Sequence, residues 1–311
     1  MKPVYTPGYR PLLFLLIIAV VMQCSVGAAS AEKPGHSEEL LQKTYQKNRG
    51  RLESSSFGLP LFLESVEQDD AVHVDVYGLF HYPFSSVVNA LTVPAHWCDI
   101  VALHPNIKAC TYRELADSRR LTLYVGRKEF QTPEDTRQIR YRYRNVDQKP
   151  GYLDIMLSAG EGPFGTRDHK MRFEALAIGE GTTFVHVSYT YIDSVALRLA
   201  SKLYFATLGR RKAGFTVTGT DGSGNPVYIG GPRGSIERNA VRYYFAIQSF
   251  MHTSHHPEQT RFNVSINEWY DLTARYKKQL FDLEKKDYLR SKTKEHKNQL
   301  LLQQQIETAH N

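Results

Sequence analysis

Apolar and polar positions alternate with a period of two over much of the chain between residues 59 and 192. In residues 71–82, Val72, Val74 and Val76 fall on one face, and the polar residues between them fall on the other. This alternation is typical of half-buried strands, and the turns are rich in glycine, proline and acidic residues. The short connections indicate an antiparallel meander. The pattern predicts strands at residues 60–66, 71–82, 121–130, 137–145, 152–160, 166–178 and 182–192.

Helical spacing replaces the alternation elsewhere. Near the C-terminus, apolar residues at three-four spacing from Trp269 to Leu283 predict one long helix from Ile266 onward, which packs on the body or on a partner. Its charged end, up to residue 311, is expected to fray or protrude. The glycine-rich stretch 220–234 is expected either to connect two helices as a plain loop or to form a flexible flap over a cavity. The other predicted helices are at residues 37–47, 84–91, 94–103, 195–207 and 235–252.

The first 31 residues have the three parts of a secretory signal. Lys2 and Arg10 form the basic start, residues 12–21 are uninterrupted and apolar, and small residues precede a cleavage site after Ala31. The apolar run is shorter than the roughly 20 residues of a spanning helix. We therefore expect a periplasmic or secreted chain. Lipidation at Cys24 is the alternative, but the residues before it match that signal poorly.

Composition limits the classes of partner. The 311 residues carry a net charge of +7, which falls to +5 without the leader because the leader has two basic and no acidic residues. This mild excess suits an anionic surface and is far from the charge of a nucleic-acid-binding protein. The 19 tyrosines and 15 phenylalanines can build an apolar core or a pocket.

Cys98 and Cys110 are the two cysteines outside the leader. In an exported chain, a pair of cysteines is first interpreted as a disulfide. A zinc site with His104 and His96 is an alternative, but the spacing matches none of the usual paired motifs. A catalytic thiolate is a further alternative that an oxidising compartment disfavours. The sequence therefore favours a Cys98–Cys110 disulfide.

The order of the predicted elements is similar to that of a known protein family. Residues 72–114, VHVDVYGLFHYPFSSVVNALTVPAHWCDIVALHPNIKACTYRE, give a strand, two short helices and a second strand, and residues 152–192 give the later strands. This order resembles the helix-grip fold of the START and polyketide-cyclase-like superfamily. The resemblance implies an α+β fold in which a curved antiparallel sheet wraps around a long helix, here 235–252, with extra N- and C-terminal helices. The predicted division is a signal peptide (1–31), a polar helical segment (32–58), a START-like domain (59–254) and a C-terminal helical arm (255–311).

The resemblance also implies a cavity between the sheet and the long helix. Members of the superfamily bind lipids, sterols or polyketides in this cavity. Tyr141, Tyr143 and Val185 lie on strand faces that would line this cavity. Asn239 and Arg242 would anchor a ligand headgroup at its mouth. The alternative for these charged helix residues is an internal ion pair with Glu237 that fixes the helix to the sheet.

Histidines supply the only catalytic candidates. His186 or His169, the latter beside Asp168, could act as a general base in the same cavity. A single strand histidine is more often a hydrogen-bonded structural residue, and the sequence lacks a G-x-S-x-G nucleophile motif. The histidines of HTSHH (252–256) are interpreted as a surface cluster. We predict no metal and no cofactor.

Arg140, Arg142 and Arg144 alternate with apolar residues in RQIRYRYRN. They form either a solvated face paired with carboxylates such as Glu129, or a row that binds phosphates of an anionic membrane surface. Lys170 and Arg172 on another strand would extend this row.

These observations predict an exported binding protein for a hydrophobic or lipidic small molecule, with lipid transport as the role such binding would serve. One alternative is a cyclase- or hydrolase-type enzyme that uses the same cavity. Another is an envelope interaction protein without a ligand, which binds a protein partner through its C-terminal helix. We expect no nucleic-acid partner.

Overall fold

The computed structural model describes residues 36–68, 71–207, 209 and 212–309. The predicted signal peptide, with Ala31 and Cys24, lies outside these residues. The described part contains an antiparallel sheet of eight strands in the order β1-β2-β8-β7-β6-β5-β4-β3. The strands are β1 (Leu61–Gln68), β2 (Ala71–Phe80), β3 (Ile107–Leu115), β4 (Ser118–Val125), β5 (Arg137–Lys149), β6 (Tyr152–Glu161), β7 (Arg167–Gly179) and β8 (Thr182–Ile192).

The chain starts the sheet at one edge with the β1–β2 hairpin and then crosses to the far edge through two short helices. From β3 it returns strand by strand until β8 pairs with β2. The helices are α1 (Glu38–Glu53), α2 (Phe84–Leu91), α3 (Pro94–Ala102), α4 (Val195–Ala206), α5 (Gly231–Thr253), α6 (Glu258–Ala274), α7 (Lys277–Leu280) and α8 (Lys285–Thr308). Two 3-10 turns, η1 (Pro133–Asp135) and η2 (Pro163–Gly165), and a small hairpin of β9 (Val217–Thr220) and β10 (Pro226–Tyr228) complete the described elements.

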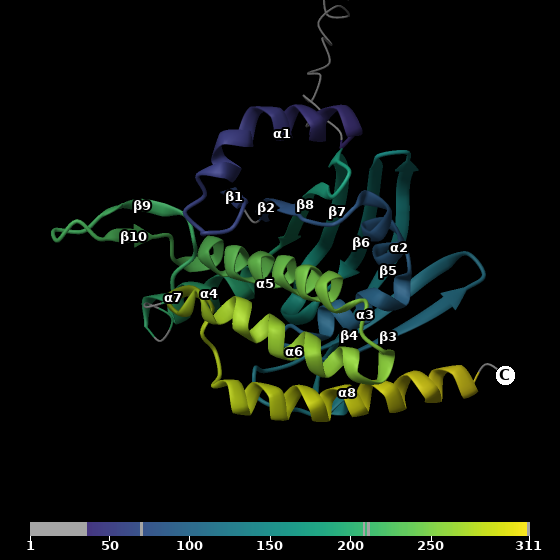
Figure 1. Cartoon of the computed structure of the whole chain (residues 1–311). Coiled ribbons are helices and arrows are strands. Elements are labelled where there is room, and N and C mark those ends of the chain that lie inside the picture. Colours follow the sequence, from purple (N-terminus) through teal and green to yellow (C-terminus); the bar gives the residue numbers. More distant parts are fainter. Residues whose placement is uncertain (1–35, 69–70, 208, 210–211, 310–311) are drawn as a thin grey trace, which may run out of the picture.

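Helix α5 packs on the inner face of the curved sheet (Figure 1). It is buried around most of its circumference, and Ala240, Tyr244 and Ile247 pack with the valines of β2. A Cβ atom on Gly78 would lie 2.0 Å from the Tyr244 hydroxyl, so the glycine lets the helix approach the strand. The predicted helix-grip fold, with residues 235–252 as the gripped helix, is confirmed.

Helix α1 covers part of the opposite, outer face of the sheet. Leu41 and Leu52 of the helix are buried against Phe62, Tyr152 and Phe184 of the strands. Figure 1 shows α1 and α5 on opposite sides of β1 and β2. Both faces are therefore covered at this end, and polar residues on the outer face lie beneath a helix.

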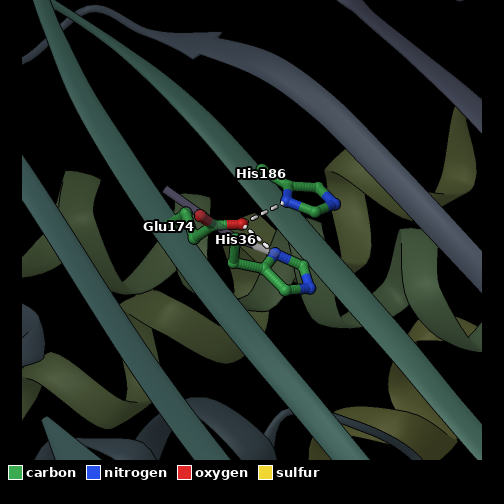
Figure 2. A group of neighbouring side chains, drawn as sticks. All are labelled: His36, Glu174 and His186. Atoms are coloured by element: carbon green, nitrogen blue, oxygen red, sulfur yellow. Dashed lines mark hydrogen bonds and ion pairs between the residues drawn. The ribbon is translucent and has the colours of Figure 1, made fainter. Parts of the chain in front are cut away.

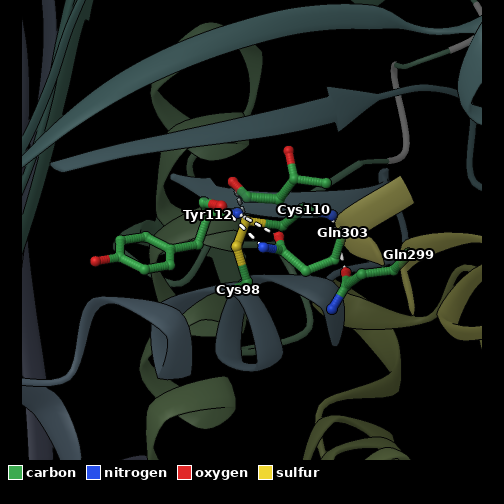
Figure 3. Close-up of a disulfide and its surroundings, with 6 residues drawn as sticks. Cys98, Cys110, Tyr112, Gln299 and Gln303 are labelled. Carbon is green, nitrogen blue, oxygen red and sulfur yellow. Dashed lines mark hydrogen bonds between the residues drawn. A yellow bond between two sulfur atoms is a disulfide. The ribbon is translucent and has the colours of Figure 1, made fainter. Parts of the chain in front are cut away.

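The disulfide predicted between Cys98 and Cys110 is present. It joins α3 to β3, with 5.0 Å between the two Cα atoms, and both residues are buried (Figure 3). The bond therefore fixes the crossing segment to the far edge strand.

The prediction of one helix from Ile266 is wrong. The chain forms α6, α7 and α8 instead, separated by breaks near Tyr276 and Asp282. Asp282 accepts a hydrogen bond from buried Arg242 at 2.6 Å and also pairs with Lys128. This buried ion pair fixes the α7–α8 connection in a non-helical path, which the apolar stripe alone does not reveal. Of the two expectations for the C-terminal end, fraying is wrong, because α8 continues to Thr308. The extended helix is present, but it packs along β3.

Strand ends differ from prediction by a few residues. β4 covers 118–125 and not 121–130, because Asn106 and Gly126 exchange backbone and side-chain hydrogen bonds where the strand ends. The glycine-rich stretch contains the β9–β10 hairpin, which extends away from the sheet (Figure 1). None of the described helices is both long and apolar enough to span a membrane.

Candidate functional site

A cluster of histidines and carboxylates lies on the outer face of the sheet. Strand register brings its members together, because His186 of β8 is the cross-strand partner of Glu174 on β7 and of Tyr77 on β2. Asp75, two positions before Tyr77, points to the same face. His36 reaches the cluster from the segment before α1, next to the N-cap residue Ser37 (Figure 2).

His186 is held by carboxylates at both ring nitrogens. Its Nδ1 lies 2.8 Å from Glu174 Oε2, and its Nε2 lies 2.8 Å from Asp75 Oδ1. Burial by itself lowers the pKa of His186, but the two hydrogen bonds outweigh burial and raise the pKa to about 9. The ring of Tyr77 stacks on the imidazole at 4.3 Å. His186 is therefore a buried imidazolium in this structure.

The two carboxylates bind further donors. His36 Nδ1 lies 2.7 Å from Glu174 Oε2, and the Tyr152 hydroxyl donates to Glu174 Oε1 at 2.7 Å. Burial opposes ionisation of Glu174, but hydrogen bonds from His186 and His36 outweigh it and hold its pKa well below the usual range. Burial likewise opposes ionisation of Asp75, but hydrogen bonds from His186 and His73 outweigh it and hold its pKa below the usual range. His73 Nε2 lies 2.8 Å from Asp75 Oδ2. Histidine and carboxylate thus alternate along one connected network.

His169, the other histidine predicted as a catalytic candidate, lies on the inner face. Its Nε2 is 2.8 Å from Thr166 Oγ1 and its Nδ1 is 3.3 Å from the Tyr189 hydroxyl. Burial lowers its pKa to about 4, although the charge of Asp168 acts in the opposite direction. The sheet separates His169 from His186, so the two histidines cannot act in one cavity.

The predicted ligand-binding residues Tyr141, Tyr143 and Val185 face inward and are buried in the core. The Tyr143 hydroxyl donates to the carbonyl of Leu91 at 3.2 Å. Near Tyr141, which is buried, the interior also holds the partly buried Tyr189, and desolvation raises the pKa values of both tyrosines. The interior between the sheet and α5 therefore contains tyrosine hydroxyl groups among aromatic side chains.

Arg242 and Asn239, predicted as headgroup anchors, lie near the middle of α5. Arg242 is buried and pairs with Asp282, and Asn239 Oδ1 accepts from it at 3.4 Å. An internal ion pair is thus present, but Arg242 pairs with Asp282 of the α7–α8 connection and not with Glu237, as the alternative had it. Glu237 binds the segment before β9, where the backbone N–H groups of Phe215 and Thr216 donate to it at 2.6 and 3.0 Å.

The arginines of β5 line an open groove of about 570 Å³ at the outer face. Arg140, Arg142 and Arg144 are exposed, and Lys170 of β7 joins them, as the sequence predicted. Arg172 instead donates two hydrogen bonds to Asp154, the first at 2.7 Å. Arg119 and Arg120 complete the basic lining, and Asp168 is the acidic residue in it. We call this feature the cationic groove.

Helix α4 presents apolar side chains to solvent. Val195, Leu199 and Leu203, spaced four residues apart, are 74%, 62% and 64% exposed. The helix contacts α5 and the turn η2, where Phe164 is 66% exposed. Ser194, the N-cap residue of α4, donates to the Phe164 carbonyl at 2.8 Å. These four exposed residues form the apolar patch.

Sequence reasoning did not find His36, Asp75 and Glu174. They come from three segments, so no local spacing joins them. Two signals were available: Glu174 interrupts the apolar run of β7, and Asp75 lies on the strand face opposite the valines. A buried carboxylate requires a partner, and this requirement points to the histidine on the neighbouring strand.

No protein-family model matches the sequence, and no curated protein matches it. Solved structures do resemble the fold. A STAR-related lipid transfer protein from Xanthomonas axonopodis is 13% identical with a TM-score of 0.36, covering 62% of this chain and 92% of that one. Human StAR-related lipid transfer protein 5 is 6% identical with a TM-score of 0.30, covering 56% of this chain and 93% of that one.

Norcoclaurine synthase from Thalictrum flavum, solved with dopamine and hydroxybenzaldehyde, is 10% identical with a TM-score of 0.32. That match covers 46% of this chain and 81% of the synthase. Similarity at this level says nothing about ligand or reaction, which depend on the residues described above.

Proposed function

We propose that the protein is an exported binding protein for a hydrophobic or lipidic small molecule, which it holds between the sheet and α5. The observation that carries this proposal is the apolar patch of Phe164, Val195, Leu199 and Leu203, which α4 and the turn η2 form beside α5. Large apolar side chains gathered in one exposed patch indicate an apolar partner, because water contact with such a surface is unfavourable.

The surroundings of the patch favour a membrane surface as the place where ligand is exchanged. Strand β5 begins beside η2, and the guanidinium of Arg137 lies 5.3 Å from the centre of the Phe164 ring. The cationic groove continues along the same strand. Apolar residues next to basic residues match a bilayer with anionic headgroups, because the former enter the interface and the latter bind phosphate.

The interior beneath the patch suits the polar end of a lipid. Tyr189 and His169 bring hydroxyl and neutral imidazole groups into an otherwise aromatic wall. Such groups can bind a ligand oxygen or hydroxyl without a buried charge. The Cys98–Cys110 disulfide supports export, since disulfides persist in oxidising compartments.

Native mass spectrometry and organic extraction of the exported protein test ligand binding. We expect a co-purifying apolar compound in stoichiometric amount. A chain that carries no such compound, and takes up none from lipid vesicles, would contradict the proposal. Replacing His169 with glutamine separates binding from catalysis. A binding protein carries the same chemical compound in the wild type and the variant, at lower occupancy in the variant because His169 contributes to binding. An enzyme of the cyclase or hydrolase type instead accumulates unreacted substrate in the variant.

Vesicle flotation tests the docking surface. The double variant Leu199→Asp with Leu203→Asp is expected to lose binding to phosphatidylglycerol vesicles. Leu301→Asp is the matched control, because Leu301 is 58% exposed on α8, outside the patch. Equal flotation of both variants would exclude α4 as the docking element.

A further inference from the structure

The outer-face cluster has the composition of a metal site. His36 Nδ1, Glu174 Oε2 and His186 Nδ1 all lie within 4.8 Å of one another (Figure 2). Zinc bound to imidazole and carboxylate has bonds of about 2.0–2.2 Å, which place tetrahedral ligand atoms roughly 3.4 Å apart. The separations of 2.7 and 2.8 Å between Glu174 Oε2 and the two nitrogens lie slightly below that spacing, so small side-chain rotations suffice.

The arrangement of the rings distinguishes the cluster from an ordinary ion pair. Both imidazoles direct Nδ1 at the same carboxylate oxygen, so the three candidate ligand atoms are already gathered within 4.8 Å of one another. Glu174 and His186 come from paired strands and are 3% and 5% exposed at their side chains. Two of the three ligands are therefore fixed by the sheet before any metal binds.

The partners behind these ligands are those that orient metal-binding side chains. Asp75 Oδ1 lies 2.8 Å from His186 Nε2, on the side of the ring away from Glu174. A carboxylate there keeps the proton on Nε2 and leaves the Nδ1 lone pair for a metal. The Tyr152 hydroxyl fixes the other oxygen of Glu174 at 2.7 Å. Both arrangements are common around zinc-binding histidines and carboxylates.

We propose that His36, Glu174 and His186 bind one zinc ion, or a similar divalent transition metal, at the outer face of the sheet. Zinc replaces the protons that the two rings now share with Glu174, because metal-binding imidazole must be neutral. His36 is 36% exposed and provides access from solvent, which leaves a fourth position for water. The ion fastens the segment before α1 to β7 and β8. The site is independent of the lipid-binding interior, because it lies on the opposite face of the sheet.

Zinc stoichiometry tests the proposal. The full chain, exported with its own leader and purified without a histidine tag, is stripped with a chelator, dialysed with zinc and measured by plasma mass spectrometry. We expect one zinc per chain, a higher melting temperature with zinc than with chelator, and the visible absorption of a tetrahedral site after cobalt substitution. Less than stoichiometric zinc without a thermal shift would overturn the site.

Variants locate the ion. His36 lies at the surface, so His36→Ala should fold normally and lower zinc affinity by more than about 100-fold, beyond the loss expected for a residue that only orients a ligand. Asp75→Asn should lower the affinity roughly 10- to 100-fold. The matched control is His255→Ala with His256→Ala, which removes two adjacent surface rings 4.3 Å apart. Zinc lost from this control and retained by His36→Ala would show adventitious surface binding and overturn the proposal.

Discussion

Gln299 accepts a hydrogen bond from the backbone N–H of Cys110 at 2.8 Å, although the residues are 189 positions apart (Figure 3). Gln303 binds both the N–H and the carbonyl of Tyr112, at 2.8 and 3.0 Å. Lys292 donates to the carbonyl of Ile107 at 2.6 Å. Side chains of α8 thus satisfy the edge of β3 that no strand pairs. An unpaired edge favours association with other chains, and α8 prevents this.

Replacing Gln299 with alanine is expected to lower the free energy of unfolding by about 1–3 kcal/mol. The substitution leaves the buried N–H of Cys110 without an acceptor, and an unsatisfied buried donor costs this much. Urea denaturation followed by circular dichroism measures the difference. Gln304→Ala is the matched control, since Gln304 is exposed one turn along the same helix, and should change stability little. Equal stability of all three proteins would mean that α8 does not protect the edge.

Removal of the disulfide is expected to destabilise the protein by roughly 3 kcal/mol, because the bond closes a loop over a sequence separation of 12. The variant to use is Cys98→Ala with Cys110→Ala, which keeps small apolar side chains in the core. Thiol titration of the denatured wild-type chain should find neither cysteine free. A double variant as stable as the oxidised wild type would contradict a stabilising role.

The fold was predictable from the sequence because local patterns of apolar and polar residues determine most of its helices and strands. Residues 84–91 and 182–192 form the predicted helix and strand with the predicted bounds. The alternation in β2 also gave the correct inward-facing side chains. Helix α2 and strand β2 bury one stripe or face in the main core, and the spacing of their apolar residues records which side is buried.

The candidate site was less predictable because its contacts join distant segments. The C-terminal helix ends before Asp282, because Asp282 forms ion pairs with Arg242 and Lys128. Both partners are far from Asp282 in sequence. His186 was identified as a residue of interest, but the sequence did not show that α1 covers the outer face of the sheet, on which His186 lies. The period-two pattern separates the two sides of a strand without saying which side holds a cavity.

Reducing the charge of the cationic groove should weaken binding to anionic membranes. The variant Arg140→Gln with Arg142→Gln removes two exposed charges from the groove. Near an anionic leaflet each basic residue contributes about 1 kcal/mol, so we expect roughly 30-fold weaker binding to phosphatidylglycerol vesicles and no change with neutral lipid. Sedimentation at two salt concentrations provides the measurement.

Arg290→Gln is the control for the groove variant, because Arg290 is an exposed arginine of α8 that pairs with Asp287 at the surface. Its binding should equal that of the wild type. Similar losses in both variants would indicate a general charge effect and exclude the groove as a specific surface.

The imidazolium of His186 predicts how stability depends on pH. Its pKa is about 9 in the folded protein, against about 6.5 in an unfolded chain. A group with a raised folded pKa stabilises fully below the unfolded pKa, and this contribution is lost as pH rises through the folded pKa. The contribution of His186 to the free energy of unfolding is therefore lost between about pH 6.5 and pH 9, and the loss is roughly 3 kcal/mol. Asp75 and Glu174, whose pKa values are lowered, lose their contribution instead as pH falls into the acid range.

Chemical denaturation across this window, with a chelator present to exclude metal, separates the contribution of His186 from other groups. Wild-type stability should decline between pH 6.5 and 9, whereas His186→Gln should be less stable at pH 6.5 and show a flatter profile. His252→Gln is the matched control, since His252 pairs with Glu268 at the surface and should keep the wild-type slope. Parallel profiles for wild type and His186→Gln would mean that the ring is neutral in the folded protein. In that case one of its two nitrogens would face a carboxylate without a proton to share, so the hydrogen bonds to Asp75 and Glu174 could not both exist.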